Sequence, residues 1–224
     1  MLLLRKFSTN YIMNNAEAGR VIAATLLEIG AIKLNLKKPF LWSSGWKSPI
    51  YCDNRLSLSF PASRTFIKEH FGQLITSKFP DAEVVAGVAT AGIPQGALVA
   101  DLLNLPFIYV RSKPKGHGME NLIEGKVEKG QKVVVVEDLI STGKSSLNSV
   151  DALRKAGLQV LGLVAIFTYG FPLADTNFKE ANVQAFALSN YTYLLEEALD
   201  KNYITNDQLV SLNGWRVDPE KWEP

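Results

Sequence analysis

Two adjacent carboxylates followed by small hydroxyl residues are the feature of this 224-residue chain that is best suited to chemistry. Glu137 and Asp138 come directly after four consecutive valines, and Ser141-Thr142-Gly143 follows them. Carboxylate oxygens suit sugar hydroxyls or a divalent cation. A turn of small residues that leads into a helix presents backbone N–H groups and the positive end of the helix dipole, which suits a phosphate. Together these residues predict a site for a phosphorylated sugar.

Two other interpretations of the same run are open. Gly143-Lys144-Ser145 matches the end of the phosphate-binding motif of P-loop NTPases. The first glycine of that motif would fall at Asp138, which argues against an NTPase. The other interpretation is an ordinary strand–turn–helix connection with solvated acids. The apolar strand, the paired acids and the Ser-Thr-Gly turn in one place argue against that interpretation.

A basic run from Arg111 to Gly118 is the second candidate. It holds two lysines and His117 among glycines and a proline. Most charge runs are solvated loops. Cationic side chains beside flexible glycines are also what a lid that closes over a polyanion needs.

Two further stretches have both a structural and a functional interpretation. Residues 40–55 are rich in aromatic and hydroxyl side chains, and Gly45 and Pro49 predict two short strands joined by a turn. This stretch is either a hairpin packed on the core or a hood that covers a planar, acidic ligand. Ala89 to Gly92 forms a second strand–turn–helix connection, which either holds a second anion or binds nothing.

Several apolar stretches that are typical of buried strands position these residues, and helix-length segments separate most of them. The alternation predicts an α/β fold with a parallel sheet flanked by helices and a small N-terminal hood, mainly residues 31–58. Residues 121–127 predict a hairpin that turns at Glu124-Gly125. His70 is predicted to be a packed histidine, because one histidine without partner ligands makes no metal site. The predicted strands are 84–88, 106–110, 132–136, 160–167 and 183–188, and the predicted helices are 14–29, 61–79, 95–103, 145–156, 191–199 and 205–212.

Composition limits the classes of protein to consider. The net charge of +2 implies no general affinity for polyanions. The single cysteine, Cys52, excludes an intrachain disulfide and fits a cytoplasmic location. No apolar run approaches the ~18 residues of a transmembrane helix. We expect residues 1–13 to be a disordered leader, and we hypothesise that Met13 is the natural start. Residues 14–224 are expected to form a single domain with a basic lid loop at 111–120.

Three stretches together resemble the orotate phosphoribosyltransferase family, a branch of the type I phosphoribosyltransferases. Val133 to Gly143 resembles the motif that binds phosphoribosyl pyrophosphate (PRPP). The Ser-Gly-x-x-Ser-Pro-x-Tyr core of residues 40–55 resembles the hood signature, and Arg111-x-x-x-Lys115-x-His117-Gly118 resembles the catalytic loop. The resemblance runs from about Ala16 to Phe167.

The resemblance implies transfer of the phosphoribosyl group from PRPP to orotate, which gives orotidine 5′-monophosphate and pyrophosphate in de novo pyrimidine (UMP) biosynthesis. It implies Mg²⁺ as cofactor, held mainly through PRPP and by no side chain directly. A homodimer with shared active sites is implied, because the family's loop reaches into the neighbouring subunit's site. Neither nucleic acid nor a membrane is an implied partner.

The family's roles carry over to matching residues of this chain. Glu137 and Asp138 would bind the ribose hydroxyls, and Thr90 to Gly92 would form the pyrophosphate loop. The backbone of residues 139–145 would cradle the 5′-phosphate, and Ser141 would also approach orotate. The catalytic candidates are Lys115, His117 and Asp138, and the PRPP-binding candidates are Arg111, Lys115, His117, Glu137, Asp138, Leu139, Ile140, Ser141, Thr142, Gly143, Lys144 and Ser145.

The chain departs from the family pattern where some members carry a basic residue. The contacts to orotate are therefore less defined than those to PRPP, and we hypothesise that Lys47 or Arg55 compensates. Two other functions remain as alternatives, a phosphoribosyltransferase for a purine or uracil and a regulatory protein that senses PRPP. The hood argues against the first, and the second would need a nucleic-acid module or a basic patch. The departures are Ser43, Ala91, Ser112 and the segment Thr168-Tyr169-Gly170.

Overall fold

The computed structural model describes residues 15–42, 45–113 and 122–223. The chain divides into two compact units. The larger unit comprises residues 65–168 and 172–188, and the smaller comprises residues 1–64, 169–171 and 189–224. The leader predicted at 1–13 lies outside the described residues, and the single domain predicted over 14–224 stays a prediction.

A six-stranded sheet forms the centre of the larger unit. Its strands are β5 (Val84–Val88), β6 (Phe107–Val110), β7 (Ile123–Glu124), β8 (Lys132–Ile140), β9 (Gln159–Thr168) and β10 (Ala185–Asn190). They lie in the order β10, β9, β8, β5, β6, β7. Strand β5 pairs in parallel with β6 and β8, and β8 pairs in parallel with β9. The predicted α/β fold with a mostly parallel sheet is therefore confirmed.

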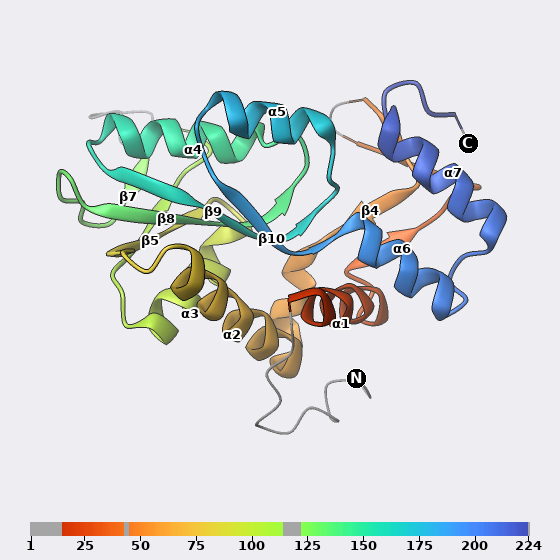
Figure 1. The fold of residues 1–224 in the computed structure, drawn as a ribbon, viewed down its shortest axis with the longest axis horizontal. Coiled ribbons are helices and arrows are strands. Elements are labelled where there is room, and N and C mark those ends of the chain that lie inside the picture. The colour runs from red at the N-terminus through yellow and green to blue at the C-terminus, as the bar shows by residue number, and fades with distance from the viewer. Residues whose placement is uncertain (1–14, 43–44, 114–121, 224) are drawn as a thin grey trace. The chain divides into compact units, whose positions relative to one another are not determined.

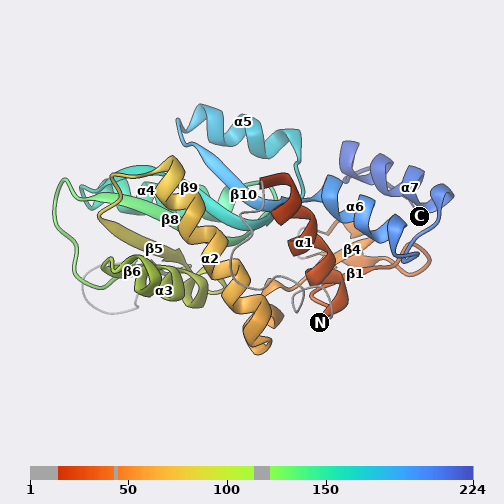
Figure 2. The ribbon, with the colours of Figure 1, turned by 60° about the horizontal axis from the view of Figure 1, so that its bottom comes forward.

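Helices cover both faces of this sheet. Figures 1 and 2 show α2 (Pro61–Lys78) and α3 (Gly92–Leu103) on one side, with α4 (Lys144–Lys155) and α5 (Pro172–Glu180) on the other. Because successive strand residues point to opposite faces, alternate valines of β8 enter the core that also holds Val150 and Leu153 of α4 and Phe178 of α5. The sequence patterns predict every one of these helices except α5.

Two local predictions about the sheet are wrong. Strand β7 pairs with β6, with Tyr109 opposite Glu124, so the hairpin encloses the basic run instead of turning at Glu124-Gly125. Strand β8 does not end at the carboxylates but continues to Ile140, with Glu137 opposite Ala165 on β9. The extension is possible because β9 itself runs on to Thr168 and offers backbone partners to the longer strand.

The smaller unit contains α1 (Asn15–Glu28), β1 (Ile32–Leu34), β2 (Phe40–Leu41), β3 (Lys47–Ser48), β4 (Ile50–Cys52), the 3₁₀ helix η2 (Asn54–Ser59), α6 (Tyr191–Asp200) and α7 (Asn206–Val217). Strands β2 and β3 pair antiparallel, and so do β1 and β4. The described residues of the stretch 40–55 thus contain three short strands and not the predicted two. Helix α7 begins at the predicted capping box, in which Thr205 and Gln208 exchange hydrogen bonds.

Aromatic side chains form the centre of the smaller unit. The ring centroid of Trp42 lies 5.1 Å from that of Tyr169 and 5.5 Å from that of Trp215. Trp42 also donates a hydrogen bond from Nε1 to the Ile50 carbonyl oxygen at 3.2 Å. Trp215 and Tyr191 are fully buried. These contacts support the interpretation of the aromatic stretch as packed structure for Trp42, and they leave its role as a hood untested.

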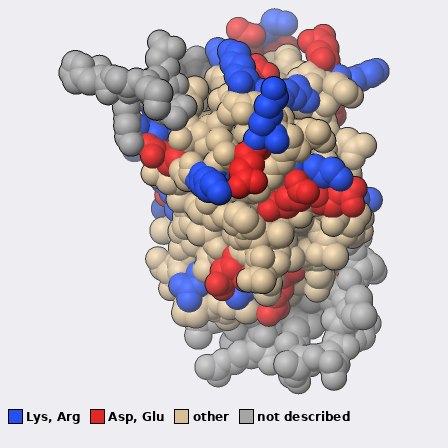
Figure 3. All heavy atoms as spheres, turned by 90° about the vertical axis from the view of Figure 1, so that its left-hand side faces the viewer, with Lys and Arg blue, Asp and Glu red and all other residues tan. Residues whose placement is uncertain are grey.

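The described part of the chain gives three further observations. No helix within it is both long and apolar enough to span a membrane. On the face drawn in Figure 3, lysine and arginine side chains are interspersed with aspartate and glutamate. His70 is half-buried, with its ring Nδ1 2.8 Å from the Phe66 carbonyl oxygen, as expected of a packed histidine.

Candidate active site

The paired carboxylates lie near the carboxyl end of β8 and differ in their surroundings. Glu137 is 4% exposed, whereas Asp138 is partly exposed. The Glu137 carboxylate accepts hydrogen bonds from the Asp138 backbone N–H at 3.1 Å and from the Ser146 hydroxyl at 3.2 Å. Burial, and next the charge of Asp138, raise the pKa of Glu137 well above its usual value. Asp138 is therefore the carboxylate of the pair that is more accessible to a ligand in the site.

The turn after β8 presents backbone donors to the same place. Gly143 has a φ of 80°, a left-handed conformation that glycine adopts without strain, and it lies at the N-cap of α4. A glycine has no side chain to accept hydrogen bonds from the first turn of the helix. The first N–H groups of α4 therefore face the turn together with the positive end of the helix dipole, which favours an anion.

A second turn, between β5 and α3, lies directly against β8. A Cβ atom at Gly92 would collide with the carbonyl oxygen of Val136, so only glycine permits this approach. Gly87 and Gly96 allow similar close packing of α3 on β5, because a Cβ at Gly96 would lie 3.2 Å from the Gly87 Cα. The peptide bond between Ala89 and Thr90 is cis. The close packing of α3, β5 and β8 fixes residues 89–91 beside the carboxylates.

Both turns and both carboxylates line one cavity of about 310 Å³. Because β5 and β8 are parallel neighbours, their carboxyl ends meet at the same edge of the sheet, where ligands bind in open α/β folds. The volume lies at the lower end of the range of small-molecule sites. Its lining residues are Ala89, Thr90, Ala91, Glu137, Asp138, Leu139, Ser141, Thr142, Gly143, Lys144, Ser145 and Ser146.

A second cavity, of about 480 Å³, shares Ala89 and Ser145 with the first. Arg111 and Lys155 contribute positive charge to its lining, and Asp151 contributes a carboxylate. The guanidinium Nη1 of Arg111 lies 3.4 Å from a carboxylate oxygen of Glu124, and both side chains are partly buried. Arg111 is thus held at the edge of the sheet, next to the carboxylate cavity.

Comparison with known proteins identifies the family. A model of the phosphoribosyl transferase domain matches residues 57–188. The orotate phosphoribosyltransferase of Cytophaga hutchinsonii is 57% identical over 202 residues, which cover 90% of this chain and 97% of that protein. The chain belongs to the orotate phosphoribosyltransferase family. A relative of the same name from Bacteroides fragilis is 56% identical over 211 residues, covering 94% of this chain and 99% of that protein.

Solved structures agree with this family assignment. The crystal structure of orotate phosphoribosyltransferase from Aeropyrum pernix matches with a TM-score of 0.72 at 30% sequence identity, and the match covers 82% of this chain and 99% of that chain. The type I phosphoribosyltransferase fold is therefore confirmed. The resemblance on which the sequence prediction depends holds over nearly the whole chain.

The structure brings together most of the residues predicted to bind PRPP in an orotate phosphoribosyltransferase. Glu137 to Leu139 and Ser141 to Ser145 all line the first cavity, with Thr90 and Ala91 opposite. Ile140 has its side chain in the hydrophobic core instead, at 4% exposure. Arg111 lies at the neighbouring cavity. Lys115 and His117, the predicted catalytic-loop residues of the family, lie outside the described residues.

The two basic residues hypothesised to compensate on the hood side both form ion pairs within the smaller unit. Lys47 lies 2.7 Å from a carboxylate oxygen of Glu223. Arg55 donates two hydrogen bonds to the Asp53 carboxylate, at 2.6 and 2.9 Å, and these bonds lower the pKa of Asp53. A role for either residue in holding orotate would require its side chain to exchange partners, and that role stays a hypothesis.

Sequence reasoning missed the residues that support the candidate site on the side away from the cavity. The Ser146 hydroxyl donates a hydrogen bond to the Glu137 carboxylate. Ser146 belongs to the hydroxyl-rich run, and assigning the start of the helix there would have indicated this contact. Asn177 of α5 donates a hydrogen bond to the Thr142 carbonyl oxygen at 2.8 Å. Asn177 lies 35 residues further along the chain, and no sequence pattern connects it to the turn.

Proposed function

We propose that this chain transfers the phosphoribosyl group of PRPP to orotate, giving orotidine 5′-monophosphate and pyrophosphate for pyrimidine synthesis. The observation that carries the proposal is the 57% identity to an orotate phosphoribosyltransferase over 90% of the chain. The cavity supports it, because carboxylates and a phosphate-binding turn lie side by side, as a ribose 5-phosphate requires.

The residue roles follow from the chemistry of the transfer. The ring nitrogen of ionised orotate attacks C1 of the ribose, and the bond from C1 to pyrophosphate breaks as pyrophosphate leaves with the electron pair. Positive charge develops on the sugar in the transition state, so the Asp138 carboxylate stabilises it there while binding the ribose hydroxyls. The turn from Ser141 to Gly143 and the start of α4 hold the 5′-phosphate, which keeps C1 in line for attack.

The leaving group is assigned to the basic loop and to the turn at Thr90. Arg111, Lys115 and His117 supply cationic donors for the departing pyrophosphate. Closure of the loop excludes water that would otherwise hydrolyse PRPP. The ionised orotate is itself a nucleophile, so the reaction requires no serine or cysteine nucleophile.

A magnesium ion fits this donor set only as a partner of PRPP. Within the described residues, no group of three or more histidine, cysteine, aspartate or glutamate side chains is arranged to hold a metal. Glu137 already accepts two hydrogen bonds from the protein. Mg²⁺ bound through PRPP oxygens would neutralise charge on the leaving group. The proposal also includes a homodimer in which the loop of one subunit completes the site of the other, and a cytoplasmic location.

The test of the proposed function is the loss of orotate absorbance in the presence of PRPP and Mg²⁺. We expect orotate consumption that depends on both additions and yields orotidine 5′-monophosphate and pyrophosphate in equal amounts. Hypoxanthine and uracil serve as competing bases. Turnover of either base without orotate consumption would overturn the assignment in favour of another phosphoribosyltransferase, and PRPP binding without any turnover would favour a PRPP sensor.

A further inference from the structure

The turn from Ser141 to Gly143 has contacts on the side away from the cavity that the proposed function does not use. Helix α5 lies on that side and supplies two neighbouring residues. Asn177 donates from Nδ2 to the Thr142 carbonyl oxygen, and the ring of Phe178 packs against Gly143. Both contacts reach the backbone of the turn and not its side chains. A phosphate site made of backbone N–H groups requires that the backbone stay in a fixed orientation, and these contacts can hold it there.

The hydrogen bond from Asn177 fixes the direction of one peptide group. In a trans peptide the C=O and the following N–H point in opposite directions. The Thr142 C=O points toward Asn177, so the Gly143 N–H points away from α5. Gly143 lines the cavity, on the other side of the turn. Asn177 therefore sets the orientation of a donor in the proposed phosphate site without touching the ligand.

Phe178 supports the same turn by close packing. It is 5% exposed and belongs to the core between the sheet and its helices. A Cβ atom at Gly143 would lie 2.9 Å from Cε2 of the ring and 3.1 Å from Cζ. The aromatic ring thus occupies the space beneath the glycine, and the turn cannot move toward α5.

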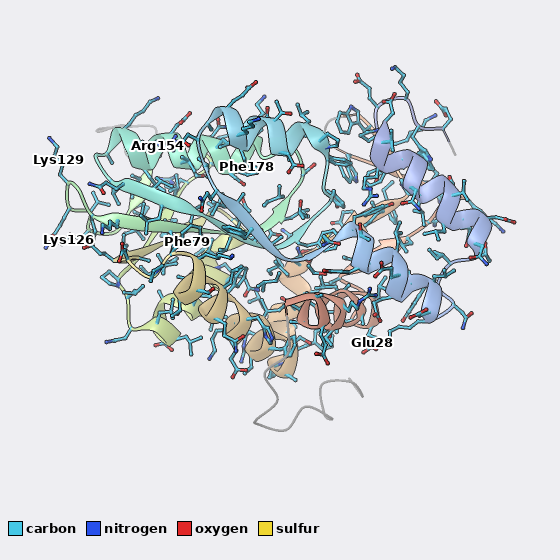
Figure 4. The ribbon with its side chains drawn as sticks, viewed as in Figure 1. Glu28, Phe79, Lys126, Lys129, Arg154 and Phe178 are labelled. Atoms are coloured by element: carbon cyan, nitrogen blue, oxygen red, sulfur yellow. The ribbon has the colours of Figure 1, made fainter. Side chains whose placement is uncertain are left out.

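Helix α5 is itself fixed to α4, the helix that follows the turn. Arg154 of α4 donates to the carbonyl oxygens of Ala181 at 2.9 Å and Asn182 at 3.2 Å, just after α5 ends. Figure 4 labels Arg154 on α4 and Phe178 on α5. Asn177 connects α5 to the turn that precedes α4. Arg154, near the end of α4, connects that helix to the residues just after α5. Helix α5, which is itself bonded to α4, therefore supports the turn on the side away from the cavity.

We propose that Asn177 is a positioning residue for the 5′-phosphate of PRPP, acting through the Thr142–Gly143 peptide, with Phe178 as the packing support beneath it. This inference rests on the proposed role of the turn as the phosphate cradle. It predicts that loss of the Asn177 donor weakens binding of the ribose 5-phosphate half of PRPP and leaves the pyrophosphate half and orotate unaffected.

The experiment compares Asn177→Leu, which removes the donor at nearly constant volume, with the wild type. We expect the Kd for ribose 5-phosphate, measured by calorimetry, and the KM for PRPP to rise about tenfold, as loss of a hydrogen bond beside a charged ligand implies. The inhibition constant of pyrophosphate and the KM for orotate should change less than about twofold. Asn213→Leu is the matched control, because Asn213 donates a similar bond to the Leu209 carbonyl oxygen in α7. It should leave all four constants unchanged.

The inference is overturned if the affinity for ribose 5-phosphate is unchanged in Asn177→Leu, or if all four constants change by the same factor as in a general loss of structure. Asn177→Ala provides a second variant with the same expected pattern should the leucine variant fold poorly. Gly143→Ala distinguishes failure of the proposed phosphate cradle from failure of the proposed positioning role of Asn177. If it leaves the affinity for ribose 5-phosphate unchanged, the cradle assignment itself fails. If it weakens that affinity and Asn177→Leu does not, the positioning role alone fails.

Discussion

Glu137 is a carboxylic acid in surroundings that oppose its charge. It is almost fully buried next to Asp138, and its raised pKa has burial as the largest cause. A buried carboxyl group with a raised pKa favours the folded state only while it is protonated. Stability from this group is therefore fully present below the usual glutamate pKa, near 4.5, and falls as pH rises through the folded-state value.

Glu137→Gln should consequently stabilise the ligand-free protein, and more so at high pH than at low pH. The amide keeps a hydrogen-bonding group toward Ser146 and the Asp138 backbone but carries no charge to bury. Urea unfolding at pH 4.5, 6 and 8 measures the difference in the free energy of unfolding from the wild type. Glu180→Gln, at an exposed position, is the control for loss of one carboxylate. A difference that shrinks as pH rises would contradict the burial argument.

Lys115 is the residue for which the sequence makes the strongest functional prediction outside the described part of the chain. Lys115→Ala should lower kcat by about a hundredfold or more, because one cationic donor to the leaving group is lost in the transition state. The melting temperature should stay close to that of the wild type. Steady-state kinetics and thermal unfolding measure the two quantities. Lys129→Ala, which removes an exposed lysine from a surface turn, should leave both unchanged. Equal kcat values for the two variants would mean that the basic run is only a solvated loop.

At the scale of elements, the site depends on how closely two turns approach each other. The turn after β5 can lie against β8 only because Gly92 has no side chain. Gly87 and Gly96 let α3 pack closely on β5 behind it. These glycines are far from the carboxylates in sequence, yet they set the distance between the Thr90 turn and Asp138.

Gly92→Ala should destabilise the protein by about 2 kcal/mol or more, as overpacking against a rigid backbone does. It should also weaken PRPP binding, because the turn between β5 and α3 must move away from β8 to admit the Cβ. Urea unfolding and the KM for PRPP measure these effects. Gly214→Ala in α7 is the control, since nothing lies within 4 Å of its Cβ position. That substitution should stabilise the protein by about 1 kcal/mol through helix propensity. A Gly92→Ala variant as stable as the wild type would show that the turn can move freely.

At the scale of the whole molecule, the proposed homodimer decides whether a single subunit holds a complete site. The cavity in the larger unit contains the residues proposed for the ribose 5-phosphate half of PRPP. The residues proposed for the pyrophosphate half lie mainly on the basic loop. If that loop acts on the neighbouring subunit, the two halves of the site come from different chains.

Hybrid dimers test this arrangement. Subunits carrying Lys115→Ala and subunits carrying Asp138→Asn are coexpressed with different tags, and the hybrids are purified by both tags. Each parent dimer should be inactive, whereas the hybrid should show about half of wild-type activity, because one of its two sites combines an intact loop with an intact carboxylate. Inactive hybrids would mean that the loop serves its own subunit. Failure to recover any hybrid would contradict the dimer.

The sequence by itself determined the strand-rich core, the family and the residues of the turn that is proposed to hold the phosphate. Four valines, two acids and Ser-Thr-Gly are adjacent in the chain, so local geometry alone places them together. The same holds for the capping box of α7, whose partners are three residues apart. Local patterns are readable in a sequence because the period of the helix or strand relates neighbouring side chains directly.

Only the tertiary structure decided what surrounds that turn. The extension of β8 to Ile140 depends on pairing with β9, and the burial of Glu137 depends on the packing of the sheet and its neighbouring helices. Helix α5, with Asn177 bonded to Thr142, has no signal in the sequence of the turn it supports. Such contacts join residues that are distant along the chain, and they form because packing selects them from many compatible partners. The sequence therefore specifies the candidate binding residues, and the fold specifies the burial of Glu137 and the direction in which the backbone donors of the turn point.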